Sequence, residues 1–282
     1  MNRKNLILLF LFVFLVTVAF LLKDAAADAV SGDHLTAMCL ESSLPCMDLV
    51  ADEETLQKEQ EEAAKTAKAE PSDEEETKTV KKASGDPKVL IYHTHATESY
   101  LPTSSGNYHT TKEENTVRDA GDVLEETLEA EGIAVVHDKT LHDNPSYNDS
   151  YTRSSETVKA LLKKYPSIEC IIDLHRDAMA GTDPGPVTQV NGKTAATYSY
   201  VISNTTETYS SNKAFLADLN DAAAEDFDGY TGSVLERPYW YNQELSGKSI
   251  LIEMGNNRNN IEEVRECARQ FGKILAQVLN EE

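Results

Sequence analysis

Hydrophobic and polar residues follow one another along residues 88–282 in a pattern that predicts a regular succession of strands and helices. Short apolar runs rich in β-formers predict strands, and apolar residues three and four positions apart predict helices. The expected strands cover residues 88–92, 133–136, 168–174, 187–190, 198–202 and 249–253, with one more beginning at residue 193. The expected helices cover residues 115–131, 154–165, 211–227 and 260–279. This alternation is typical of an α/β fold, with a mostly parallel sheet flanked by helices on both faces.

Local signals mark the ends of several of these elements. Gly132 is expected to stop the helix that precedes it, and Pro166 to stop the next one. Asn191-Gly192 is typical of a type I′ turn and predicts a hairpin. Asn260 and Glu263 have the spacing of a helix cap and its partner in the first turn.

The beginning of the chain follows a different pattern. Residues 6–22 carry no charge and come after Arg3 and Lys4. The run is just long enough to cross a membrane, and the positive residues before it place the amino terminus in the cytosol. A secretory signal cleaved near residues 25–27 is the alternative. We expect an uncleaved single-pass anchor. With an anchor or with a cleaved signal, the folded part would lie outside the cytosol.

The region between this segment and the folded domain is rich in Glu, Lys, Ala, Thr and Asp and has almost no large apolar residues. Such a composition cannot bury a core and predicts an extended linker. We therefore expect three parts: residues 1–23 as cytosolic terminus and transmembrane anchor, residues 24–87 as acidic flexible linker, and residues 88–282 as catalytic domain.

The charge and cysteine content exclude some kinds of function. The chain has 48 acidic and 26 basic residues and a formal net charge of -22, so we expect no binding to nucleic acid. Its four cysteines include no Cys-x-x-Cys pair, so a zinc site made of thiolates is not expected.

Three of the apolar strands end in residues that can bind a metal or carry a proton. His93, His95 and Glu98 follow the strand at residues 88–92. His175 ends a second strand, and Glu253 ends a third. Because the carboxyl ends of parallel strands share one edge of a sheet, these side chains are expected to converge.

Two histidines and one glutamate are suitable ligands for Zn²⁺ and leave a fourth position open for water. We predict that His95, Glu98 and His175 bind Zn²⁺ and that Glu253, off the metal, acts as the general base. Asp173, two residues before His175, is expected to point to the other face of the strand and to be structural. Arg176 and Arg118 are candidates for holding an oxyanion or a substrate carboxylate, or for ordinary ion pairs.

Five stretches cover most of residues 88–282 and read YHTHATESYLP, NTVRDAGDVLEETLEAEGIAVVHDKTLHD, PSYNDSY, IIDLHRDA and NQELSGKSILIEMGNN. Together they resemble the stage II sporulation protein P family, cell-wall hydrolases of endospore-forming bacteria. The resemblance implies a zinc-amidase core of the phosphorylase/hydrolase-like α/β type. It also implies N-acetylmuramoyl-L-alanine amidase activity on peptidoglycan, with endopeptidase cleavage of stem-peptide cross-links.

The same resemblance implies a setting and a partner. The protein would act in forespore engulfment, between the mother-cell and forespore membranes, together with stage II sporulation protein D. It leaves two ligand positions open. His93 is an alternative to His95, and the zinc amidases place a carboxylate ligand at the head of the following helix, which points to Glu113 instead of Glu98.

Two other functions fit the same residues. A metallo-carboxypeptidase acting on cell-wall peptides would use a similar set of histidines and glutamates. A catalytically inactive wall-binding scaffold is the alternative that is not an enzyme.

Overall fold

The computed structural model describes residues 83, 85–103 and 108–281. Its main sheet has six strands in the order β2-β1-β3-β8-β6-β7, and a separate hairpin pairs β4 with β5. The strands are β1 (Val89–Tyr92), β2 (Val135–His137), β3 (Cys170–Asp177), β4 (Val187–Val190), β5 (Lys193–Ala196), β6 (Tyr198–Ser203), β7 (Ser233–Arg237) and β8 (Ser249–Asn256).

The sheet is mainly parallel, as predicted. Strands β2, β1, β3 and β8 run parallel to one another, while β6 is antiparallel to β8 and parallel to β7. The central strands β1, β3 and β8 are buried along nearly their whole length, which explains their continuous apolar runs. Strand β7 was not predicted, and most of its residues are exposed.

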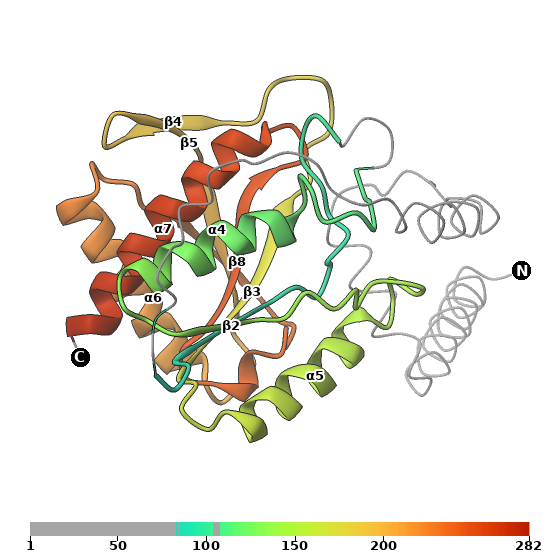
Figure 1. The fold of residues 1–282 in the computed structure, drawn as a ribbon, viewed down its shortest axis with the longest axis vertical. Coiled ribbons are helices and arrows are strands. Elements are labelled where there is room, and N and C mark those ends of the chain that lie inside the picture. Colours follow the sequence, from blue (N-terminus) through green and yellow to red (C-terminus); the bar gives the residue numbers. More distant parts are fainter. Residues whose placement is uncertain (1–82, 84, 104–107, 282) are drawn as a thin grey trace, which may run out of the picture. The chain divides into compact units, whose positions relative to one another are not determined.

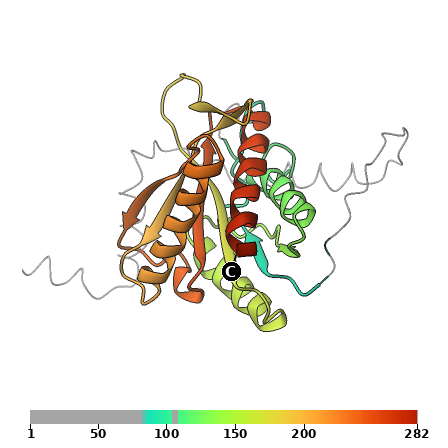
Figure 2. The ribbon, with the colours of Figure 1, turned by 90° about the vertical axis from the view of Figure 1, so that its left-hand side faces the viewer.

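Helices cover both faces of the sheet (Figure 1). They are α4 (Val117–Ala130), α5 (Ser150–Lys164), α6 (Tyr209–Asp226) and α7 (Ile261–Glu281), with a 3₁₀ turn η2 at Gln243–Leu245. Val89 and Ile91 of β1 join the core formed with α4, α6 and α7, whereas Leu90 and Tyr92 pack towards α5. Figure 2 shows α6 and α7 lying side by side over one face. Alternate residues of β1 thus pack into the cores on the two faces of the sheet. Burial of each large apolar side chain stabilises the folded state by about 1.5–3 kcal/mol.

The predicted turn and cap signals are present in the structure. Asn191 and Gly192 both have positive φ angles, 50° and 71°, as a type I′ turn between β4 and β5 requires. At the start of α7, the backbone N–H of Asn260 donates to Glu263 Oε2, and Asn260 Oδ1 accepts from the N–H of Glu262, each at 3.0 Å. These bonds satisfy groups that the first turn of a helix would leave without partners.

The predicted anchor at residues 6–22 and most of the linker lie outside the described residues. Within the described ranges, no helix is long and apolar enough to span a bilayer.

Candidate metal centre

The carboxyl ends of β1, β3 and β8 lie next to one another, because these three parallel strands are adjacent in the sheet (Figure 1). His175 on β3 is the lateral partner of Glu253 on β8. The segment that follows β1 carries His95 and Glu98. The topology therefore brings together residues that are up to about 160 positions apart in the chain.

His95, Glu98 and His175 form a compact group, called the trio below. His95 Nδ1 lies 3.7 Å from Glu98 Oε1, and His175 Nδ1 lies 3.6 Å from Glu98 Oε2. One ligand atom from each residue can be chosen so that all three lie within 4.8 Å of one another. Glu98 and His175 are only 6% and 3% exposed. Two imidazoles and a carboxylate at this spacing fit Zn²⁺, with room in the coordination sphere for a further ligand.

The two histidines of the trio differ in protonation. Burial lowers the pKa of His95 well below its usual value, and positive charge on His175 lowers it further. Burial alone would also lower the pKa of His175, but the carboxylates of Asp173, Glu98 and Glu253 outweigh it and raise that pKa to about 10. His95 is therefore neutral and able to bind a metal, whereas His175 must first release a proton.

The prediction that Asp173 points away from the site is wrong. Its Oδ1 lies 2.9 Å from His175 Nε2, and its two oxygens accept hydrogen bonds from the backbone N–H and the hydroxyl of Thr94 at 2.8 and 2.6 Å. Residues two apart in a strand project from the same face, which the prediction overlooked. The contact is an ion pair, because His175 Nε2 makes no hydrogen bond within the described residues. A carboxylate beside the second ring nitrogen helps to orient a metal-binding histidine, and Asp173 lies in that position.

Glu253 lies beside the trio without belonging to it. Its Oε2 is buried and has no hydrogen-bond partner within the part of the chain that the structure describes. Burial raises the pKa of Glu253 to about 8, with His175 opposing the shift and Glu98 adding to it. A carboxyl group that titrates near neutral pH is suited to exchanging protons with a substrate. Gly255 follows within β8 with a φ of +62°, a conformation that favours glycine.

Arg176 and Arg118 hold the segment after β1 in place. The backbone N–H of Arg176 donates to Glu98 Oε2 at 3.1 Å, and its guanidinium donates to backbone carbonyl oxygens of that segment. The guanidinium of Arg118 also donates to backbone carbonyl oxygens there. Both side chains are buried. This geometry places both guanidinium groups against backbone carbonyl oxygens of the segment after β1.

The two alternative ligands lie apart from the trio. His93 Nδ1 faces the carbonyl oxygen of Leu174 at 2.9 Å, and His93 Nε2 faces His137 Nε2 at 2.8 Å. Glu113 Oε1 accepts a hydrogen bond from Lys139 Nζ at 2.6 Å. The structure thus directs both ring nitrogens of His93 and the carboxylate of Glu113 to other partners.

Asp122, Glu125 and His137 form a second group of side chains with metal-ligand chemistry. Lys139 Nζ already lies 2.5 Å from Asp122 Oδ1. Burial would lower the pKa of His137, but hydrogen bonds to Asp122 and Glu125 outweigh it and raise that pKa. A lysine and a histidine that favours its charged form neutralise these carboxylates, so we interpret the group as an ion-pair cluster.

Aromatic rings beside the trio were not predicted from the sequence. The ring of Tyr147 stacks on His95 with centroids 4.2 Å apart, and its hydroxyl lies 3.2 Å from His95 Nδ1. Tyr151 meets His95 edge-on with centroids 5.7 Å apart. The sequence signals are the family-like stretch PSYNDSY and the spacing within it of two tyrosines four residues apart, on either side of the first residue of α5.

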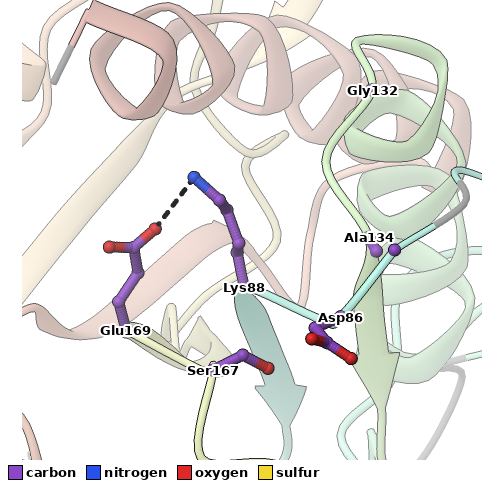
Figure 3. Close-up of a pocket in the computed structure, with 7 residues that line it drawn as sticks. Asp86, Lys88, Gly132, Ala134, Ser167 and Glu169 are labelled. Carbon is purple, nitrogen blue, oxygen red and sulfur yellow. Dashed lines mark ion pairs between the residues drawn. The ribbon is translucent and has the colours of Figure 1, made fainter.

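A surface hollow lies at the opposite edge of the sheet, where β1 begins (Figure 3). Its lining consists of Gly85, Asp86, Lys88, Gly132, Ala134, Ser167 and Glu169. Lys88 Nζ and Glu169 Oε1 form an ion pair at 3.4 Å. The hollow contains no histidine and lies before β1, whereas the trio follows it, so it is not a candidate for the same chemistry.

A protein family and one curated relative match most of the chain. The model of the family described as stage II sporulation protein P (SpoIIP) matches residues 17–279. Stage II sporulation protein P of Bacillus subtilis strain 168 is 28% identical over 222 residues, which are 73% of this chain and 55% of that protein. The chain therefore spans about half the length of this curated relative.

Two solved structures are similar at low identity. The CwlD amidase from Clostridioides difficile, solved in complex with the GerS lipoprotein, has a TM-score of 0.46 at 12% identity and covers 69% of this chain and 100% of its own. The N-acetylmuramyl-L-alanine amidase Ami1 from Mycobacterium smegmatis has a TM-score of 0.43 at 15% identity. The match covers 71% of this chain and 100% of the amidase chain. At these scores the likeness carries no conclusion about chemistry.

Proposed function

The chain belongs to the stage II sporulation protein P family, and from this premise we propose that it is a zinc-dependent peptidoglycan hydrolase. The proposed reactions are N-acetylmuramoyl-L-alanine amidase cleavage and endopeptidase cleavage of stem-peptide cross-links. The observation that carries the proposal is the convergence of His95, Glu98 and His175 beside Glu253, whose carboxyl oxygen Oε2 is buried. Both reactions hydrolyse an amide, which this set of groups is suited to do.

The trio would hold the metal, with Asp173 fixing the ring of His175. Zinc bound there would supply positive charge that polarises the scissile carbonyl and makes an attacking water more acidic. Glu253 accepts a proton from that water and returns it to the departing amine nitrogen of L-alanine. Water thereby replaces nitrogen on the lactyl carbonyl carbon, leaving a carboxylate on the sugar side and an amine on the peptide.

Tyr147 is placed to assist this reaction. Its hydroxyl lies at the edge of the trio, 3.2 Å from His95 Nδ1. From there the phenol can donate a hydrogen bond to the scissile carbonyl oxygen as negative charge develops on it. Tyr147 is 47% exposed while Glu98 and His175 are buried, so its phenol lies between the interior of the site and solvent.

Digestion of purified peptidoglycan by the zinc-loaded full chain tests the proposal. We expect new amino-terminal L-alanine, glycan strands freed of stem peptides, and cleaved cross-links. Free carboxyl-terminal amino acids without muramoyl–alanine cleavage would instead identify a metallo-carboxypeptidase. Binding to the wall without any product would identify an inactive scaffold.

We further propose that residues 6–22 anchor the protein in the cell membrane and that residues 88–282 act between the mother-cell and forespore membranes, with stage II sporulation protein D as partner. The length of the uncharged segment supports the anchor. We expect the full chain to stay with membranes after washing at high salt. Soluble mature protein that begins near Asp28 would show a cleaved signal instead.

A further inference from the structure

An exposed aromatic loop lies between β7 and β8. It contains Tyr239, Trp240 and Tyr241, and Trp240 is the only tryptophan in the chain. Its side chain is 66% exposed, the largest exposure among the large hydrophobic residues that the structure describes as exposed. Large apolar groups on a surface stabilise the fold little and often mark a binding site.

This loop is connected to the metal centre by a continuous series of rings. Tyr151 meets His95 with centroids 5.7 Å apart, Tyr241 lies 5.7 Å from Tyr151, and Tyr239 lies 5.9 Å from Tyr241. We call Tyr151, Tyr241, Tyr239 and Trp240, which lies between the last two in the sequence, the aromatic row. It begins beside His95 and ends at the exposed Trp240.

Buried polar residues hold the loop in position. Asn242 Nδ2 donates to Ser154 Oγ on α5 at 2.9 Å. The side chain of Gln243 bonds to the backbone of β6 on both sides, accepting from the N–H of Ser203 and donating to the carbonyl oxygen of Val201, each at 2.7 Å. The aromatic row is thus presented by a fixed segment.

The backbone of the loop is also unusual. Tyr241 and Asn242 both have positive φ angles, 51° and 58°. A bulky residue such as tyrosine rarely adopts this conformation, and such strain tends to persist where it serves a function. Here it accompanies the placement of the Tyr241 ring between those of Tyr151 and Tyr239.

We propose that the aromatic row is a saccharide-binding subsite for the glycan strand that carries the scissile amide. The inference rests on the proposed function, because only then is a sugar attached close to the bond that the trio cleaves. Aromatic faces carry negative charge density and attract the C–H groups of a sugar ring, while phenol hydroxyls can bond to sugar hydroxyls. An anionic membrane surface is a poorer occupant for a chain with a net charge of -22.

The emission of Trp240 tests the subsite directly, because no other tryptophan contributes. The probe is glycan strands of alternating N-acetylglucosamine and N-acetylmuramic acid from which all stem peptides have been removed, added to the full chain. We expect a saturable blue shift of the emission and at least a twofold reduction in quenching by acrylamide. Tyr241→Ala should weaken this binding about tenfold, equivalent to about 1.4 kcal/mol. Tyr165→Ala, at the opposite end of α5, is the matched control and should bind like the parent.

Digestion of intact peptidoglycan provides the second measurement. Trp240→Ala should lower kcat/KM about tenfold, mainly through KM, with circular dichroism unchanged. The parent could cleave peptidoglycan while its emission stays unchanged on addition of glycan strands and Trp240→Ala digests peptidoglycan at the parent's rate. That result would refute the saccharide subsite and leave the proposed function standing. A shift of emission with phosphatidylglycerol vesicles but not with glycan would make the row a membrane contact. Failure of the parent to cleave peptidoglycan would overturn the proposed function and this inference with it.

Discussion

Replacing Asp173 by asparagine tests how the centre controls its affinity for metal. In the parent, Asp173 Oδ1 lies 2.9 Å from His175 Nε2 and is the main charge that raises the pKa of His175 to about 10. Zinc can bind His175 only after the ring loses its extra proton. The parent should therefore bind zinc about tenfold more tightly for each unit of pH between about 8 and 10.

The size of the effect on zinc binding follows from the difference between the pKa of His175 and neutral pH. At pH 7 the His175 proton should weaken zinc binding by about 4 kcal/mol, since one unit corresponds to about 1.4 kcal/mol. In Asp173→Asn the pKa of His175 falls, so zinc affinity should be nearly flat between about pH 8 and 10. In the metal-free parent, His175 stabilises the fold fully below its unfolded pKa of about 6.5, and this contribution disappears as pH rises through about 10.

The assay is competition for zinc with a fluorescent chelator across this pH range, with thermal unfolding as a check on folding. Asparagine keeps an acceptor for the N–H of Thr94, so the variant should fold. Asp143→Asn is the matched control: Asp143 also accepts from the N–H and hydroxyl of a threonine, Thr97, at 3.1 and 2.6 Å, but lies outside β3. The reasoning is refuted if Asp173→Asn keeps the parent's pH slope, or if the parent has none.

Two other predictions concern the remaining residues of the centre. His95→Ala, His175→Ala and Glu98→Ala should each lose bound zinc, measured by mass spectrometry, and lose activity, whereas Glu113→Ala should keep both. Normal zinc in Glu98→Ala with loss in Glu113→Ala would reverse the assignment of the carboxylate. Glu253→Gln should keep zinc and fold normally while turnover of peptidoglycan falls about 10²–10⁴-fold, the usual contribution of general acid–base catalysis. Loss of zinc in Glu253→Gln would make Glu253 a ligand, and near-normal turnover would leave it a structural residue.

The sheet could be predicted where burial alone determines the sequence pattern. Strands β1, β3 and β8 are buried on both faces and therefore read as continuous apolar runs. Strand β7 lies at the edge, and its pairing with β6 comes from tertiary contact rather than from a local pattern. The antiparallel direction of β6 likewise has no local signature.

The candidate site was predictable as far as strand ends could be located. His175 and Glu253 were placed at one edge because each ends an apolar run. The contact between Asp173 and His175 was also available from the two-residue period of a strand, and the error lay in applying it. The approach of Tyr151 to Tyr241, 90 positions along the chain, depends on how α5 packs and could not be read from the sequence.

Locating zinc in crystals of the zinc-loaded protein tests the central claim most directly. Anomalous scattering at the zinc absorption edge gives the position of the ion without reference to activity. The account predicts one strong peak among His95, Glu98 and His175, with Glu253 nearby but not bound. A peak at Asp122, Glu125 and His137 instead, or no peak at the trio, would contradict it.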